Sequence, residues 1–140
     1  MIVQDQRLVD EIIAKYVGLP FVHNGRDPKT GVDCLGLIHC LYKDLGIDFP
    51  ADDGAYIEED WYVTDPNRYL RNLLQLGVAV EKSELQKLDL VYFYIKGTVR
   101  HAGIMTSETT FIHTLQNRYS RITRLARYWD YAFAGARRLI

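Results

Sequence analysis

The chain has 140 residues, of which 48% are hydrophobic, and its formal net charge at pH 7 is −1. This length and this apolar content predict a single compact domain, residues 1–140, with a core of its own. The balanced charge argues against a nucleic-acid-binding protein, which would carry a strongly basic surface. No apolar run approaches the ~18 residues that a membrane-spanning helix needs, so we expect no membrane partner.

The start of the chain, residues 1–7, lacks the basic segment and apolar core of a secretory signal peptide. We therefore expect a protein that is made in the cytoplasm and that needs another carrier if it acts outside a cell. Cys34 and Cys40 lie six residues apart on one predicted helix, and this geometry disfavours a disulfide between them. Both cysteines are predicted to be free thiols.

The first half of the chain is predicted to be helical. Apolar side chains repeat at helical spacing over residues 5–17 and 33–45, and Asp65-Pro66-Asn67 is typical of the start of a third helix. A glycine ends each of these helices, at positions 18, 46 and 77. We expect a loop over 18–32 and a surface excursion over 47–64, whose aromatic side chains either pack together or line one wall of a cleft: Tyr56, Trp61 and Tyr62.

Beyond residue 77 the pattern changes to short β-rich runs divided by polar or glycine-containing breaks. The expected strands cover residues 78–80, 88–95, 101–105, 111–115, 122–125 and 131–137. Helices followed by strands indicate an α+β fold, in which N-terminal helices pack on a C-terminal antiparallel β-sheet.

Cys34 is the most informative residue of the sequence, because it opens the second predicted helix directly after Asp33. Backbone N–H groups and the helix dipole favour an anion in the first turn of a helix, and attack on a carbonyl needs the thiolate. This position is typical of a cysteine nucleophile, whereas Cys40, farther along the same helix, is interpreted as a small core residue. The backbone N–H of Cys34 is also a natural donor for the oxyanion that the attack creates.

His101 and His113 lie twelve residues apart in two predicted strands. A tight loop of residues 107–109 would set His113 opposite Gly103, with His101 as a diagonal neighbour within reach of its imidazole. A cysteine nucleophile needs an imidazole as base, and the base needs a third group that fixes its tautomer. We therefore predict that Cys34 attacks an amide, His101 takes and returns the proton, and His113 orients His101, so that the amide is hydrolysed through a thioester.

Five segments together resemble, in order and spacing, the NlpC-type family of papain-like cell-wall cysteine peptidases. These segments are Gly18-Leu19-Pro20-Phe21, Asp33-Cys34-Leu35-Gly36-Leu37, Leu88-Asp89-Leu90-Val91, His101-Ala102-Gly103-Ile104 and Phe111-Ile112-His113. The resemblance implies a papain-like fold and cleavage of stem peptides in bacterial peptidoglycan, commonly at the bond between D-γ-glutamate and a diamino acid. It also implies that Cys34, His101 and His113 are the nucleophile, the base and the polar third residue.

Two positions differ from the usual family pattern. Phe21 stands where the family often has tyrosine, and Leu35 stands where it often has serine. A hydroxyl that helps orient the site or the substrate is therefore missing, although Phe21 can still shape the pocket by packing. Asp33 matches an acidic residue that in relatives can bind a free amine of the stem peptide, so it has two interpretations, a substrate-binding residue and a helix N-cap.

Other features resemble the phage-tail and gene-transfer-particle branch of this family: the stretch Gly31–Leu37, the tyrosine and tryptophan residues after the second helix, and the closing segment Trp129–Arg138 with its Ala134-Gly135-Ala136-Arg137-Arg138. This likeness implies phage-tail proteins as partners and delivery to the cell wall on a phage-like tail. Two alternatives stay open. One is a tail-assembly or structural protein that keeps the fold with little activity. The other is a small-molecule amidase or acyltransferase, ranked lower because related folds with that activity often have histidine before cysteine.

No cofactor and no metal are expected. The spacing of Cys34, Cys40 and the histidines matches none of the compact paired patterns of structural zinc sites. His23 and His39 are interpreted as bystanders, since His39 follows Cys34 by five positions, about 140° around a helix.

Overall fold

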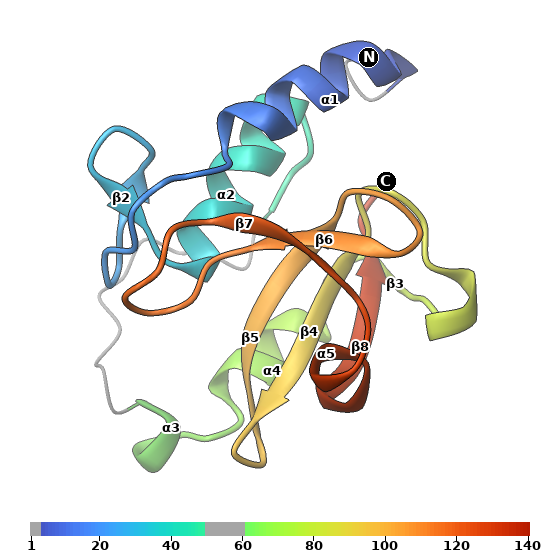
Figure 1. Ribbon diagram of the computed structural model, residues 1–140. Helices are drawn as coiled ribbons and strands as arrows, with labels where there is room; N and C mark the ends of the chain where they lie inside the picture. The colour runs from blue at the N-terminus through green and yellow to red at the C-terminus, as the bar shows by residue number, and fades with distance from the viewer. Residues whose placement is uncertain (1–3, 50–60) are drawn as a thin grey trace.

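A computed structural model describes residues 4–49 and 61–140, which form an α+β fold (Figure 1). The helices among these residues are α1 (Gln6–Lys15), α2 (Cys34–Leu45), α3 (Trp61–Thr64), α4 (Arg68–Leu73) and α5 (Tyr128–Ala132), with a 3₁₀ turn at Lys82–Glu84. The strands are β1 (Arg26–Asp27), β2 (Gly31–Val32), β3 (Val78–Ala79), β4 (Leu90–Ile95), β5 (Thr98–Met105), β6 (Thr110–His113), β7 (Arg121–Arg124) and β8 (Phe133–Arg138).

Strands β3 to β8 form one antiparallel sheet in the order β3-β8-β4-β5-β6-β7, and β1 pairs with β2 in a separate hairpin. Figure 1 shows β6 and β7 crossing over the ends of β4 and β5, so that the sheet is strongly curled. The α1–α2 pair lies at one end of the molecule and the short helices α3 and α4 at the other. The predicted α+β class and antiparallel sheet are confirmed.

The first two predicted helices form where the sequence indicated, because their capping residues fit the required geometry. The Asp5 carboxylate accepts a hydrogen bond from the Leu8 N–H at the start of α1, and the Asp33 carboxylate accepts one from the Gly36 N–H at the start of α2. Helix α2 ends at Gly46, whose φ of 76° is the left-handed conformation that glycine adopts without strain.

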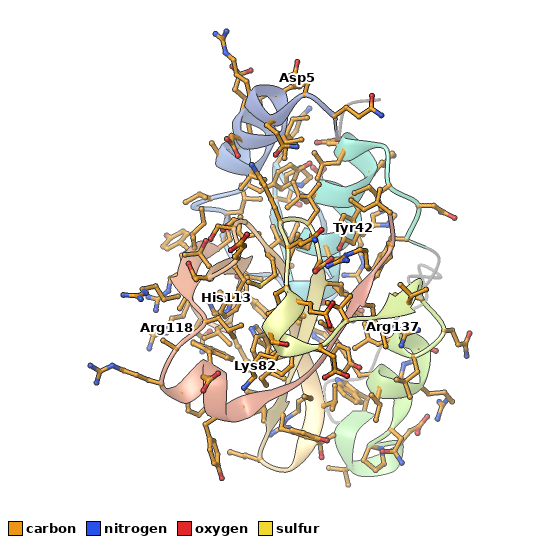
Figure 2. All side chains as sticks on the ribbon, turned by 90° about the vertical axis from the view of Figure 1, so that its right-hand side faces the viewer. Asp5, Tyr42, Lys82, His113, Arg118 and Arg137 are labelled. Atoms are coloured by element: carbon orange, nitrogen blue, oxygen red, sulfur yellow. The ribbon has the colours of Figure 1, made fainter. Side chains whose placement is uncertain are left out.

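The sheet has an apolar layer on each face, because side chains alternate along its strands. Leu90 and Ile104 face the core formed with α1 and α2, whereas Val91 and Met105 face a second, smaller core under α5. Figure 2 shows His113 inside the body of the molecule and Arg118 extending from its surface. Both faces of the central strands are therefore covered, and polar side chains on them are removed from bulk water.

Three predictions are corrected by the structure. The loop over 18–32 contains the β1–β2 hairpin, because two-residue strands give too short a pattern to detect. Ile47 and Phe49, assigned to a surface excursion, are buried with exposed fractions of 6% and 7%, while Tyr56 lies outside the described residues. The last strand begins at Phe133 rather than at residue 131, since helix α5 occupies the preceding turn and a half. Among the described residues, no helix is both long and apolar enough to cross a membrane.

A two-point ion pair ties the last strand to the start of β4. The Arg138 Nε and Nη2 atoms each lie 2.8 Å from an oxygen of Asp89, whose side chain is 1% exposed. Asp89 also accepts a hydrogen bond from the Gln86 backbone N–H at 2.8 Å. The C-terminal strand is therefore anchored by a buried carboxylate.

Arg138→Met is expected to lower the free energy of unfolding by about 2 kcal/mol, because it leaves the buried Asp89 carboxylate without its cation. Chemical denaturation monitored by circular dichroism measures the change. The matched control is Arg71→Met, which removes an ion pair to Asp65 whose side chains are 53% and 44% exposed and is expected to change stability little. Equal effects of the two variants would contradict the account of Asp89.

Candidate active site

Cys34 is the first residue of α2 and its side chain is half-buried. The β1–β2 hairpin packs closely on this first turn: a Cβ added to Gly36 would lie 1.9 Å from the backbone carbonyl oxygen of Gly25. Only glycine at position 36 allows this approach. The motif that follows Cys34 therefore has a packing role, which holds the segment leading into β1 against the start of the helix.

The sulfur of Cys34 has two hydrogen-bonding neighbours. Its Sγ lies 2.9 Å from the hydroxyl oxygen of Tyr69 in α4, and the backbone of Ala102 in β5 also bonds to it. Burial and the carboxylate of Asp33 raise the pKa of the thiol to about 11, while Tyr69, Ala102 and the charge of Arg26 lower it. This direction is opposite to the one expected from the helix N-terminus alone, so the resting thiol is protonated at neutral pH.

The two predicted histidines meet at the junction of β5 and β6. His101 Nε2 lies 2.8 Å from His113 Nδ1, and both side chains are buried, with 4% and 1% exposed. Met105 pairs with Phe111, which is the register predicted for the hairpin. A Cβ added to Gly103 would lie 3.2 Å from the Cβ of His113, so the two residues are opposite each other and the glycine leaves room for the imidazoles.

Both histidines are neutral at physiological pH. Burial, followed by the proximity of His113, lowers the pKa of His101 to about 3. Burial, followed by the positive charge of Arg121, lowers the pKa of His113 to about 4. Each imidazole therefore carries one proton, and each ring has one donor and one acceptor nitrogen.

The hydrogen bonds restrict which nitrogens carry these protons. His113 Nε2 lies 2.8 Å from the hydroxyl oxygen of Thr123 in β7. If His113 donates to Thr123, its Nδ1 accepts from His101 Nε2, and His101 Nδ1 is left with a free lone pair. In this tautomer His101 is able to act as a base through Nδ1.

An aromatic group encloses the histidine pair. The Trp129 ring of α5 has its centroid 5.0 Å from that of His101 and 4.9 Å from that of His113. Phe93 lies 5.8 Å from His101, and Phe111 lies 4.4 Å from His113, measured between centroids. These rings exclude water from the imidazoles, which is the physical cause of their lowered pKa values.

The thiol and the histidine pair approach each other at β5. Cys34 packs against the main core, and its sulfur has a hydrogen bond to the backbone of Ala102, the residue that follows His101 in β5. The structure thus brings the predicted nucleophile to the strand segment that carries the predicted base.

Asp33 is fully engaged within the protein. One carboxylate oxygen accepts from the Gly36 N–H at 2.8 Å and from Arg26 Nη1 at 2.7 Å, and the other accepts from the Asn24 N–H at 2.9 Å. This geometry shows an N-cap that also fixes the segment leading into β1. The other predicted substrate-binding residue, Phe21, is half-buried and pairs through its backbone with Val32, two residues before the nucleophile.

Cys40, the other cysteine, has a different role from Cys34. Cys40 is buried and its Sγ lies 3.1 Å from the backbone oxygen of Arg26, so it has the core role predicted for it. Both cysteines are free thiols, as expected. Within residues 4–49 and 61–140, no group of three or more His, Cys, Asp or Glu side chains is arranged to hold a metal ion.

The geometry agrees with comparisons to known proteins. The sequence pattern of the NlpC/P60 family matches residues 18–138, which include Cys34, His101 and His113. The chain belongs to the NlpC/P60 family.

Murein DD-endopeptidase MepH of Escherichia coli is 31% identical over 133 residues, which cover 91% of this chain and 44% of MepH. Gamma-D-glutamyl-L-lysine dipeptidyl-peptidase of Bacillus cereus is 34% identical over 102 residues, which cover 71% of this chain and 25% of the enzyme. The chain therefore spans less than half the length of each of these relatives.

The crystal structure of an NlpC/P60 family protein from Bacillus cereus superposes with a TM-score of 0.68 and 32% identity, covering 94% of this chain and 40% of that protein. The α+β fold is thus the papain-like fold of NlpC/P60 domains.

Sequence reasoning missed three members of this NlpC/P60 site. Tyr69 falls within the third predicted helix and Thr123 within the predicted strand 122–125, and no role in the site is predicted for either residue or for Trp129. Each comes from an element far from Cys34 and His101 in the sequence, and no spacing rule links them. The sequence contains one weak indication of Tyr69 and Trp129. Both are large aromatic residues with a polar atom, and that atom needs a hydrogen-bond partner when it is buried.

Proposed function

We propose that this NlpC/P60 domain is a cysteine peptidase that hydrolyses an amide bond in peptidoglycan stem peptides. The observation that carries the proposal is the convergence on β5 of a half-buried thiol at a helix start and a hydrogen-bonded pair of neutral histidines. A neutral imidazole with a free nitrogen beside a thiol is the arrangement needed for base-assisted attack on a carbonyl.

The proposed reaction has two halves. In the first, the Cys34 thiol proton moves to His101 Nδ1, the sulfur bonds to the amide carbon, and the carbonyl electron pair moves to oxygen. The backbone N–H of Cys34 stabilises that oxyanion. The Asp33 side chain does not compete for this donor, because it caps the helix through the Gly36 N–H. His101 then returns the proton to the leaving nitrogen as the C–N bond breaks. In the second half, water loses a proton to His101 and bonds to the acyl carbon, the C–S bond breaks, and His101 returns the proton to the Cys34 sulfur.

The electrostatics favour a neutral resting pair, in which the proton leaves Cys34 only as substrate is attacked. The pKa of the thiol is raised to about 11 and that of His101 is lowered to about 3. When His101 takes up the proton, its Nε2–H donates to the neutral His113 and spreads the charge toward Thr123. In this tautomer the His113 Nδ1 atom is therefore the acceptor that orients His101 while it carries the proton.

The bond between D-γ-glutamate and a diamino acid is the proposed point of cleavage. Relatives that share the sequence pattern include one enzyme named for a γ-D-glutamyl-L-lysine bond and another named as a murein DD-endopeptidase. The first name supports the γ-glutamyl bond for this chain. The second makes a D,D-peptide bond the alternative that a substrate panel must include.

The substrate test compares the purified protein with its Cys34→Ala variant on purified peptidoglycan and on synthetic stem peptides containing either bond. The proposal expects new amine and carboxyl termini by mass spectrometry with the parent protein, and none with Cys34→Ala. Equal product from both proteins would contradict it. Intact substrate with both proteins would favour the alternative of a structural protein that keeps the fold.

We also propose that the protein reaches the cell wall as part of a phage-like tail, with other tail proteins as partners. The support is the likeness of residues 31–37 and 129–138 to that branch of the family. Mass spectrometry of purified particles from the source cells is expected to detect the protein. Its absence from the particles, with the protein present in the cells, would contradict this part of the proposal.

Thr123→Val is expected to lower kcat by about tenfold with little change in KM, because the acceptor that fixes the His113 tautomer is lost. The valine keeps the shape of threonine without its hydroxyl. Thr110→Val is the control, because the Thr110 hydroxyl bonds to the hydroxyls of Thr106 and Ser107 and to neither histidine, and it is expected to retain the activity of the parent protein. A Thr123→Val protein with unchanged kcat would show that the tautomer is fixed elsewhere.

A further inference from the structure

We propose that Tyr69 is a catalytic residue, whose phenolic hydroxyl donates a hydrogen bond to the sulfur of Cys34 and stabilises it as a thiolate. The inference rests on the proposed function, and it assigns to helix α4 a part of the active site that the family motifs do not contain. Tyr69 lies outside the five sequence segments that carry the family resemblance.

The geometry places the hydroxyl directly on the nucleophile. Tyr69 Oη lies 2.9 Å from Cys34 Sγ, and the tyrosine side chain is 8% exposed. Its ring stacks on Trp61 of α3, with centroids 5.7 Å apart and an angle of 21° between the planes. Helix α4 also packs on β5, the strand of His101. Stacking on Trp61 thus holds the Tyr69 ring in place, and the Tyr69 hydroxyl points at the sulfur of Cys34.

The phenol is the donor whenever the sulfur is charged. A thiolate has no proton to give, so only Tyr69 can supply one to this hydrogen bond. Burial and the proximity of Cys34 raise the pKa of Tyr69 well above its usual value, so the hydroxyl keeps its proton throughout the pH range of the reaction. The contact is therefore stronger with the thiolate than with the thiol, which is the condition for assisting the attack.

The site needs such a donor because the other influences on Cys34 oppose ionisation. Burial and the Asp33 carboxylate both disfavour a negative sulfur. The donors at the sulfur are Tyr69 and the Ala102 backbone, and only the first can be removed by substitution. A hydrogen bond to a charged acceptor changes an equilibrium by roughly tenfold to a hundredfold. The Tyr69 hydroxyl therefore lowers the pKa of the Cys34 thiol and shifts its ionisation toward the thiolate.

The test is Tyr69→Phe, which keeps the ring and its stacking on Trp61 and removes only the hydroxyl. The matched control is Tyr42→Phe, because Tyr42 is also buried and its hydroxyl donates to the Leu88 backbone oxygen at 2.8 Å rather than to the thiol. Two readouts are taken on the full chain: the rate of Cys34 alkylation by iodoacetamide against pH, and kcat and KM on a stem peptide. Chemical denaturation shows whether both variants are folded.

Tyr69→Phe is expected to slow alkylation of Cys34 about tenfold at pH 8, to move the alkylation profile to higher pH, and to lower kcat more than it raises KM. Tyr42→Phe is expected to leave all three unchanged. Unchanged or faster alkylation in folded Tyr69→Phe would overturn the inference, because the hydroxyl would then be a restraint on the thiol. Alkylation does not depend on peptidase activity, so a failure of the proposed function on every peptide is separable from a failure of the role of Tyr69.

Discussion

His101→Ala is expected to lower kcat/KM on a stem peptide by about 10⁴-fold, the scale seen when one member of a nucleophile–base–orienter set is removed. His101 is the only imidazole in the proposed mechanism that takes the thiol proton. Its loss leaves a thiol with a pKa of about 11 and no base to ionise it at neutral pH. Initial rates by liquid chromatography of the cleaved peptide measure the effect, with the fold checked by circular dichroism.

The control for this prediction is His39→Ala. His39 lies on α2, the helix of Cys34, but five positions farther along and on another side of it. This variant is expected to keep the parent kcat/KM within about twofold, because surface changes away from a site have small effects. If His39→Ala were as inactive as His101→Ala, or if His101→Ala kept a tenth of the parent activity, the assignment of the base would be wrong.

The buried histidines are expected to make the fold sensitive to acid. In the unfolded chain each imidazole has an ordinary pKa near 6.5, whereas burial lowers the folded pKa of His101 to about 3 and that of His113 to about 4. The unfolded state therefore binds protons that the folded state excludes. The stability contributed by the neutral pair is fully present above pH 6.5 and is lost as the pH falls toward 4.

The expected loss in the free energy of unfolding between pH 7 and pH 5 is about 2 kcal/mol for each histidine. Urea denaturation at the two pH values measures it. His101→Gln, which keeps an amide able to donate to His113, is expected to remove about half of the histidine-linked loss, whereas His39→Gln leaves it unchanged. A parent protein with equal stability at pH 7 and pH 5 would show that the pair is already charged or open to water in the folded state.

Local patterns in the sequence predicted the parts of the fold that depend on neighbouring residues. The N-cap at Asp33, the left-handed Gly46 and the register that places His113 opposite Gly103 each depend on a few adjacent positions. The α1 and α2 helices and the antiparallel sheet followed from apolar periodicity for the same reason. These predictions succeeded because propensity and tertiary packing favour the same structure.

Local patterns did not predict the pKa values of the site or the residues that contact Cys34 and the two histidines from other elements. The helix start suggested an easily ionised thiol, but burial and the carboxylate of Asp33 prevail and raise the pKa of Cys34. Tyr69 and Trp129 reach the site from α4 and α5, so their contacts depend on how distant elements pack. Burial and long-range contacts are properties of the folded chain, and a single sequence contains no local pattern for them.

Intact-protein mass spectrometry of an acid-quenched reaction with a synthetic γ-D-glutamyl stem peptide tests the proposed thioester on Cys34 most directly. The account predicts a transient mass increase equal to the acyl half of the peptide, located on Cys34 after digestion, and absent in Cys34→Ala. Product formation without this thioester, or with an adduct on another residue, would contradict it.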